Sequence, residues 1–308
     1  MVKLRILNIL LLLLAMHFSI SNVYAQKVIH YYNPTWSPDG TKLLFESTRD
    51  GKSSIFTISI DGSDLKKLTD TIYDYGQPAW SPDGRSIVYY GSQQPMQLFT
   101  NSSTGGMQTE LPTPLYDAYE PNCSSNQILV FNSRKIGQTP NDISIMNING
   151  TSLKIITDSS HDFSSPAWSP DGTKILFKRS VAIRKKWKDI TPEERIQMRD
   201  SSEIMSMNAD GSNIQNLTKN NVRDISPSWS PDGHSFYYLS EVAAGKALFK
   251  QKIKTGKRKQ ICMLHKDMNR VSISPDQKYL AYAAERENKS AVYILDIRKN
   301  SETVIIGD

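Results

Sequence analysis

Acidic side chains recur at one position of this sequence, five or six residues before a Trp or the residue that replaces it. Aromatic residues often flank the acids, and a His takes their place in the first unit. The binding candidates in this set are Asp74, Tyr75, Asp117, Tyr119, His161, Asp162, Asp224, Asp267 and His30. If folding gathers them, carboxylates bordered by aromatic rings could bind a cation such as calcium, a basic peptide or a sugar. The alternative is structural, because an Asp that recurs in every unit can bond the backbone amides that start a strand.

No residue is predicted to be catalytic, and no metal site or cofactor is predicted. The sequence contains neither a G-x-S-x-G nucleophile motif nor an H-E-x-x-H metal motif. Beyond residue 25 the histidines are His30, His161, His234 and His265, and no two of them stand at ligand spacing. A binding protein is therefore the leading hypothesis. The alternative is a carbohydrate-active or metal-dependent hydrolase or lyase, because catalytic groups converge in space rather than in sequence.

The elements that must position these residues come from a repeat. The motif Trp-Ser-Pro-Asp-Gly begins at residues 36, 80, 168 and 229, and degenerate copies begin at Cys123 and Ile273. Successive copies are 44, 43, 45, 61 and 44 residues apart, so there are six units of one length and one insertion. A period of about 40 to 50 residues is typical of β-propeller blades, whereas a β-sandwich has no reason to repeat in this way.

Each unit has the pattern of four antiparallel strands. Ser-Pro-Asp-Gly suits a tight turn, with Pro fixing φ and Gly free to adopt positive φ. An apolar run such as 42–45 follows, then an alternating strand such as 56–60, a second Asp-Gly turn and a more polar strand such as 65–69. The sequence therefore predicts an all-β, six-bladed propeller over residues 26–308. How the ring closes stays open, because segments 27–30 and 303–306 both resemble an outer strand.

The repeat resembles the propeller of the periplasmic TolB family. The resemblance rests on Trp-Ser-Pro-Asp-Gly followed by an apolar strand, Ser and Arg (residues 45–51), then Ile-Phe-x-Ile-x-x-Asp-Gly and Leu-Thr, and it covers the chain after its leader. It implies a propeller that binds an envelope protein or peptide. Similar repeats also precede the hydrolase domain of prolyl oligopeptidase-like enzymes and occur in oligogalacturonate lyases, so the fold transfers more readily than the function. TolB proteins carry an α/β domain ahead of the propeller, and here the first repeat follows the leader directly.

The first 25 residues have the order of a secretory signal peptide. Lys3 and Arg5 precede an apolar run at 6–15 and a polar stretch that ends at Ala25, where we expect cleavage. The apolar run is too short to span a bilayer comfortably, although an uncleaved anchor is the alternative. We therefore expect a periplasmic or secreted protein with no transmembrane segment in its mature chain. We also expect it to be a monomer.

A nucleic-acid partner is not expected. Loss of the leader lowers the formal net charge from +6 to +4, because Lys3 and Arg5 leave with it. The remaining Lys and Arg residues are scattered along the chain rather than collected on one predicted face. A basic cluster at 250–259 could serve solubility or weak contact with anionic surfaces.

Two features place the expected working face. In a four-stranded blade, the tight turns lie on one rim, and the longer loops, which include the blade-to-blade connections, lie on the other, where binding residues are usually found. The insertion at 180–200 in blade four belongs to this long-loop rim. It contains a basic run with Trp187, followed by a capping box that predicts a short helix over 192–199. Trp187 is a binding candidate, unless it simply packs onto the propeller.

The remaining Trp and Cys residues are expected to be structural. The four motif Trp residues should pack between blades, since their place in the repeat is expected to fall at the start of the innermost strands. Cys123 and Cys262 fall in an innermost and an outermost strand of different blades, so no disulfide is expected between them.

Overall fold

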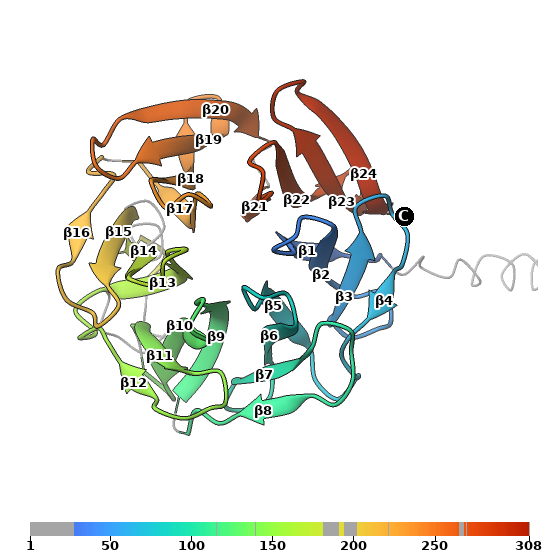
Figure 1. The fold of residues 1–308 in the computed structure, drawn as a ribbon, viewed down its shortest axis with the longest axis horizontal. Helices are drawn as coiled ribbons and strands as arrows, with labels where there is room; N and C mark the ends of the chain where they lie inside the picture. The colour runs from blue at the N-terminus through green and yellow to red at the C-terminus, as the bar shows by residue number, and fades with distance from the viewer. Residues whose placement is uncertain are drawn as a thin grey trace, which may run out of the picture.

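The structure is a computed structural model that describes residues 28–114, 116–138, 140–180, 191–193, 202–220, 222–264, 268 and 270–307. Six four-stranded sheets are arranged radially around a central axis, and each sheet is one blade (Figure 1). All neighbouring strands within a blade are antiparallel. The predicted all-β, six-bladed propeller is confirmed. The predicted signal peptide, Trp187, Asp267 and most of the 180–200 insertion lie outside the described residues, although Pro192 and Glu193 are helical.

The strands follow the chain from the channel outward in every blade. Blade 1 consists of β1 (Tyr31–Trp36), β2 (Lys42–Ser47), β3 (Ser54–Ser59) and β4 (Lys66–Lys67), and blade 2 of β5 (Tyr75–Trp80), β6 (Ser86–Gly91), β7 (Gln97–Ser102) and β8 (Thr109–Leu111). Blade 3 consists of β9 (Tyr116–Cys123), β10 (Ile128–Lys135), β11 (Asp142–Asn147) and β12 (Lys154–Ile155), and blade 4 of β13 (Asp162–Trp168), β14 (Lys174–Ser180), β15 (Glu203–Asn208) and β16 (Gln215–Asn216). Blade 5 consists of β17 (Asp224–Trp229), β18 (Ser235–Val242), β19 (Gly245–Lys252) and β20 (Arg258–Leu264), and blade 6 of β21 (Val271–Ile273), β22 (Tyr279–Arg286), β23 (Lys289–Asp296) and β24 (Ser301–Gly307).

The ring closes by packing between the first and last blades. The C-terminal strand β24 completes blade 6, so all four strands of that blade come from one continuous segment (Figure 1). Tyr31 at the start of β1 donates its backbone N–H to Ser290 Oγ at 3.0 Å across the closure. Trp36, Leu43 and Phe56 share an apolar cluster with residues of blade 6. Burial of apolar surface therefore joins the ends of the chain, as it joins every other pair of blades.

The tight turn after each inner strand explains the repeated motif. In the first copy, Ser37 Oγ donates to Asp39 Oδ1 at 2.6 Å, and the same oxygen accepts the Thr41 N–H at 3.0 Å. Lys42 donates its N–H to Ser37 Oγ at 2.9 Å, and Gly40 has φ of +73°. The Ser and Asp thus satisfy the backbone donors of the turn, and Gly supplies the positive φ.

The motif Trp residues clamp adjacent blades together. The indole N–H groups of Trp36, Trp80 and Trp229 donate to the carbonyls of Ser272, Thr35 and Ala167 at 3.1, 3.2 and 3.1 Å, and each of these carbonyls belongs to the inner strand of the preceding blade. Trp168 is as buried as Trp36, but its indole N–H finds no acceptor among the described residues. The expectation of inter-blade packing is confirmed, but each Trp is the last residue of its inner strand rather than the first. The Trp of the repeat thus joins each blade that carries it to the preceding blade.

The two cysteines are free thiols. Cys123 is buried in β9, the innermost strand of blade 3, and Cys262 is partly buried in β20, the outermost strand of blade 5. Burial raises the pKa of the thiol to about 12 for Cys123 and to about 11 for Cys262. Both therefore remain protonated at neutral pH. Among the described residues, no helix has the length and apolar character needed to cross a membrane.

Candidate binding site at the channel mouth

The repeated Asp residues bond to the preceding blade. Asp74, Asp117 and Asp162 each accept the backbone N–H of the residue just before the third strand of that blade, at 2.7, 3.1 and 3.0 Å. Asp224 accepts the side-chain N–H of Asn220 at 2.9 Å, and its backbone N–H donates to Ser202. The carboxylates of Asp74, Asp117 and Asp162 therefore hold consecutive blades together, the backbone of Asp224 does so for blade 5, and none of the four lines the two channel cavities described below.

The flanking aromatic candidates also form hydrogen bonds within the propeller. Tyr75 is fully buried, and its hydroxyl donates to Asp70 Oδ1 at 2.7 Å. Tyr119 donates to Asn141 Oδ1 at 2.6 Å. His161 lies beside Ser160, with its Nδ1 at 3.0 Å from the serine hydroxyl. His30 is the one described member of the expected set that lines the cavity at the channel mouth.

A different position of the repeat supplies the channel lining. These residues stand three before the motif Trp, usually just before a Pro, and they are Asn33, Gln77, Glu120, Ser165, Ser226 and Arg270. We call them the channel ring. The first five have φ between 49° and 54°, and strand pairing is interrupted at each of these five positions. A β-bulge re-aims a side chain, and Pro cannot donate to the ladder, so each bulge turns a polar side chain toward the channel.

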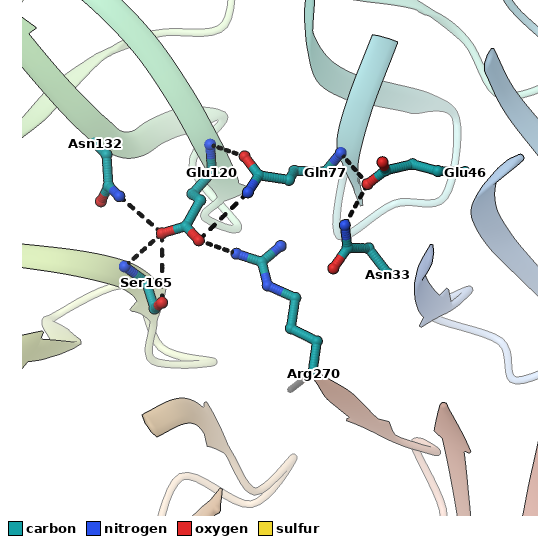
Figure 2. A network of polar contacts seen from close by, with 7 residues as sticks. All are labelled: Asn33, Glu46, Gln77, Glu120, Asn132, Ser165 and Arg270. Carbon is teal, nitrogen blue, oxygen red and sulfur yellow. Dashed lines mark hydrogen bonds and ion pairs between the residues drawn. The ribbon is translucent and has the colours of Figure 1, made fainter. Parts of the chain in front are cut away.

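An ion pair crosses the channel within this ring. Arg270 belongs to blade 6 and Glu120 to blade 3, which stands opposite, and their Nη2 and Oε1 atoms are 2.6 Å apart (Figure 2). Glu120 Oε2 also accepts the Asn132 Nδ2 at 2.7 Å and the Ser165 N–H at 2.7 Å. Burial by itself would raise the pKa of Glu120, but Arg270 and these donors outweigh it, and the pKa is lowered. We call this pair the crossbar.

A second buried carboxylate extends the network through blades 1 and 2. Glu46 Oε1 accepts the Gln77 N–H at 2.6 Å and the side-chain amide of Asn33 (Figure 2). The Gln77 side chain continues to Glu120, accepting its N–H at 3.0 Å. Burial raises the pKa of Glu46, because neutral donors and the more distant Arg270 do not compensate for its desolvation. The pKa values of Glu46 and Glu120, two acids of one network, are thus shifted in opposite directions.

Two cavities meet the crossbar. The larger, of about 410 Å³, opens at the long-loop rim, and we call it the mouth cavity. The smaller, of about 150 Å³, lies along the inner strands toward the tight-turn rim. Glu120 and Arg270 line both cavities. The crossbar therefore marks the floor of the mouth cavity.

Cationic side chains from three blades line the mouth cavity. They are Lys178 of β14, Arg223 just before β17, and Arg270 of the crossbar. Arg223 Nη1 is 3.0 Å from Glu241, and His30 Nδ1 is 3.8 Å from Glu285. Burial lowers the pKa of Lys178, although Asp162 and Glu120 partly oppose the shift. Three cationic side chains and two carboxylates, those of Glu120 and Glu285, therefore line this cavity, and two of the cations are paired with carboxylates.

The cavity forms where one repeated position loses its polar side chain. In the second strand of each blade, the residue after the central aromatic or its counterpart is Glu46, Tyr90, Asn132, Lys178, Leu239 or Ala283. Blades 1 to 4 carry polar groups there, whereas blades 5 and 6 carry apolar ones. Ala283 and the neighbouring Ala284 line the cavity beside Ile225. Small side chains on blade 6 leave room that the larger residues fill elsewhere. This signal and the residue before Pro were both readable in the sequence.

The described residues contain no group of three or more His, Cys, Asp or Glu side chains arranged to hold a metal ion. The two acids of the network, Glu120 of the channel ring and Glu46 beside it, accept hydrogen bonds from amides, and Glu120 also accepts one from a guanidinium. What the arrangement can do chemically is to present cations and N–H donors to a ligand that enters from the long-loop rim.

Comparison with known proteins agrees with this architecture. The family model described as the TolB beta propeller domain matches residues 11–199 and 194–307. An uncharacterised protein of Agrobacterium fabrum, Atu1656, is 29% identical over 214 residues, covering 66% of this chain and 67% of that protein. The Tol-Pal system protein TolB of Syntrophus aciditrophicus is 58% identical over 36 residues, which is 12% of this chain and 8% of that protein.

Solved structures give the same fold. The TolB crystal structure from Acinetobacter baumannii superposes with a TM-score of 0.66 at 18% identity, covering 89% of this chain. This chain spans 62% of that TolB chain, less than two thirds of its length. With six repeats, four-stranded blades and a family model that matches most of its length, the chain belongs to the TolB β-propeller family.

Proposed function

We propose that this protein is an exported, non-catalytic binding module of the cell envelope that recognises a protein or peptide at its long-loop rim. The observation that carries the proposal is the mouth cavity, whose walls combine side chains from blades 1, 3, 4, 5 and 6. Its volume of about 410 Å³ falls within the range of ligand pockets. The signal-peptide pattern of residues 1–25 supports a periplasmic or secreted location.

The residue types at the mouth favour a protein or peptide partner. Tyr32 is 44% exposed at the edge of the cavity and stacks on His30, with ring centroids 6.0 Å apart. Arg223 and Arg270 lie deeper in the same cavity. Tyr and Arg are enriched among the residues that dominate protein interfaces, because each combines a large contact area with directed hydrogen bonds.

The proposal can be tested with one truncation on each rim. A partner captured from envelope extract with the wild-type protein would be purified, and its affinity compared with those for Tyr32→Ala and Ile60→Ala. Ile60 is 42% exposed just after β3, at the tight-turn rim, so it controls for loss of exposed apolar area. We expect Tyr32→Ala to weaken binding about thirtyfold, which corresponds to about 2 kcal/mol for a hot-spot residue. Ile60→Ala should leave the affinity unchanged.

Two results would contradict the proposal. One is equal affinity of the wild type and Tyr32→Ala together with a loss in Ile60→Ala, which would place the partner on the other rim. The second is turnover of a polysaccharide or peptide that disappears in His30→Ala, which would establish a catalytic site at the channel mouth. Circular dichroism of each variant shows whether the fold is intact.

A further inference from the structure

We propose that the mouth cavity is a carboxylate site that holds the C-terminus of a peptide whose last side chain is apolar. Lys178, Arg223 and Arg270 would hold the carboxylate, and Ile225, Ala283 and Ala284 would hold the side chain. The proposal names the ligand class of the site proposed above and rests on that function.

Lys178 is the central observation. It is half-buried in the second strand of blade 4, paired with Ser164 of the inner strand, and it lines the cavity. Its ammonium group makes no hydrogen bond and no ion pair within 4.0 Å to any residue that the structure describes, although Asp162 and Glu120 act on it at longer range. A cation withdrawn from water without a direct partner is costly. An anionic ligand in the cavity would supply that partner.

The two arginines add directed donors. Arg270 uses Nη2 for Glu120, and Figure 2 shows its other Nη free of any dashed contact among the residues drawn. Arg223 uses Nη1 for Glu241. A guanidinium has five N–H donors in a fixed fork, so each arginine keeps donors for a ligand carboxylate after its structural contact is made.

The acids at the cavity leave Lys178 without a direct carboxylate partner among the described residues. Glu120 is already occupied by Arg270, Asn132 and Ser165. Glu285 is about half exposed, faces His30 and lies at the outer edge. Lys178 is therefore the cation that would gain most from a negative group in the cavity, since Arg270 is paired with Glu120 and Arg223 with Glu241.

The apolar wall selects the kind of carboxylate. Ile225 and Ala284 belong to the apolar core cluster between blades 5 and 6, and Ala283 belongs with that between blades 6 and 1. Their cavity faces adjoin the cationic groups within one pocket. A peptide C-terminus presents a carboxylate and an adjacent side chain in this way, whereas a uronate sugar surrounds its carboxylate with hydroxyl groups. The wall thus favours a peptide.

The test uses a matched pair of probes. Isothermal titration of the purified protein at low ionic strength would compare N-acetyl-Ala-Ala-Leu with a free carboxylate, the same tripeptide as a carboxamide, and trigalacturonate. Lys178→Met and Arg223→Gln remove charge from the cavity with little change in side-chain length. Lys174→Met is the control, because Lys174 lies on the same strand, is also half-buried and bonds Asn208 at the tight-turn end.

The expected result is saturable binding of the free tripeptide and at least about tenfold weaker binding of the carboxamide. Lys178→Met and Arg223→Gln should each weaken binding of the free tripeptide by a similar factor, and Lys174→Met should leave it unchanged. The inference is overturned if the wild type binds neither peptide, if it binds both equally, or if Lys178→Met binds as the wild type does. Binding of trigalacturonate in place of the peptide would overturn the peptide assignment.

The two proposals fail separately. If Tyr32→Ala loses the captured partner while the tripeptide measurements show no role for Lys178, the rim still binds its partner but the cavity is not a carboxylate site. If Tyr32→Ala keeps the partner with full affinity while Ile60→Ala loses it, the proposed function fails whatever the tripeptide does.

Discussion

Replacing Glu120 with Gln keeps the shape of the side chain and removes the charge that faces Arg270. The amide can still accept a hydrogen bond from Ser165, but it must present an NH₂ group to a second donor. Removing one partner of a buried ion pair costs about 3 to 5 kcal/mol. Arg270 retains 30% exposure and Glu120 15%, so water can partly solvate the orphaned guanidinium. We therefore expect a loss of about 3 kcal/mol in the free energy of unfolding, the lower end of that range.

The expected change in melting temperature follows from size. A folded region of about 280 residues has an unfolding entropy of about 0.6 kcal/mol/K, so about 3 kcal/mol lowers the midpoint by about 5 °C. Urea unfolding followed by circular dichroism, alongside thermal melts, would measure both quantities. Glu203→Gln is the matched control, because Glu203 also pairs with an Arg, Arg179 at 2.7 Å, but its side chain is more exposed than that of Glu120, 24% against 15%. That variant should lose about 1 kcal/mol or less.

The pH dependence gives a second reading of the same ion pair. The pKa of Glu120 is lowered in the folded state, so its contribution is complete above the ordinary value of 4.5 and disappears as the pH falls through the lowered value. The advantage of the wild type over Glu120→Gln should therefore shrink at acid pH. Equal stability of the two proteins at pH 7, or a difference independent of pH between 3 and 7, would refute the crossbar as a stabilising ion pair.

Glu46→Gln should show the opposite pH trend, because burial raises the pKa of Glu46 and its protonation favours folding. In urea unfolding, the free energy of unfolding of the wild type should rise relative to that of this variant as the pH falls from 7 toward 4.5. A relative rise on raising the pH would contradict this. Gly211→Ala should cost more than Gly256→Ala in thermal melts, since both have positive φ but a Cβ at 211 would lie 2.4 Å from a backbone oxygen and one at 256 would meet nothing. The costs should be above about 2 and about 1 kcal/mol, and equal costs would refute the clash. Trp229→Phe should lower the free energy of unfolding by about 1 kcal/mol more than Trp168→Phe does, because of these two residues Trp229 alone has an acceptor for its indole N–H among the described residues. Chemical denaturation of both variants measures the difference, and equal losses would show that the hydrogen bond does not stabilise the fold.

The blade architecture could be predicted from sequence because its determinants are local. A Ser-Pro-Asp-Gly turn bonds within six residues, and Trp-Ser-Pro-Asp-Gly recurs at a nearly constant spacing, so each copy reports the same hairpin. Strand number and order follow from those turns. Ring closure could not be predicted, because segments 27–30 and 303–306 have similar patterns. Packing of β24 against β23 decided it.

The channel could not be assembled in the same way. The recurrent Asp residues were visible, but whether Asp117 points into the channel or to the preceding blade depends on a hydrogen bond between segments 21 residues apart. Glu120 and Arg270 are 150 residues apart, and only the curvature of the closed ring sets blades 3 and 6 opposite each other. The sequence by itself determined the blades, because turns and alternating strands act over a few residues. The tertiary structure alone decided which polar groups share the channel, because closing the ring is what brings them within reach of one another.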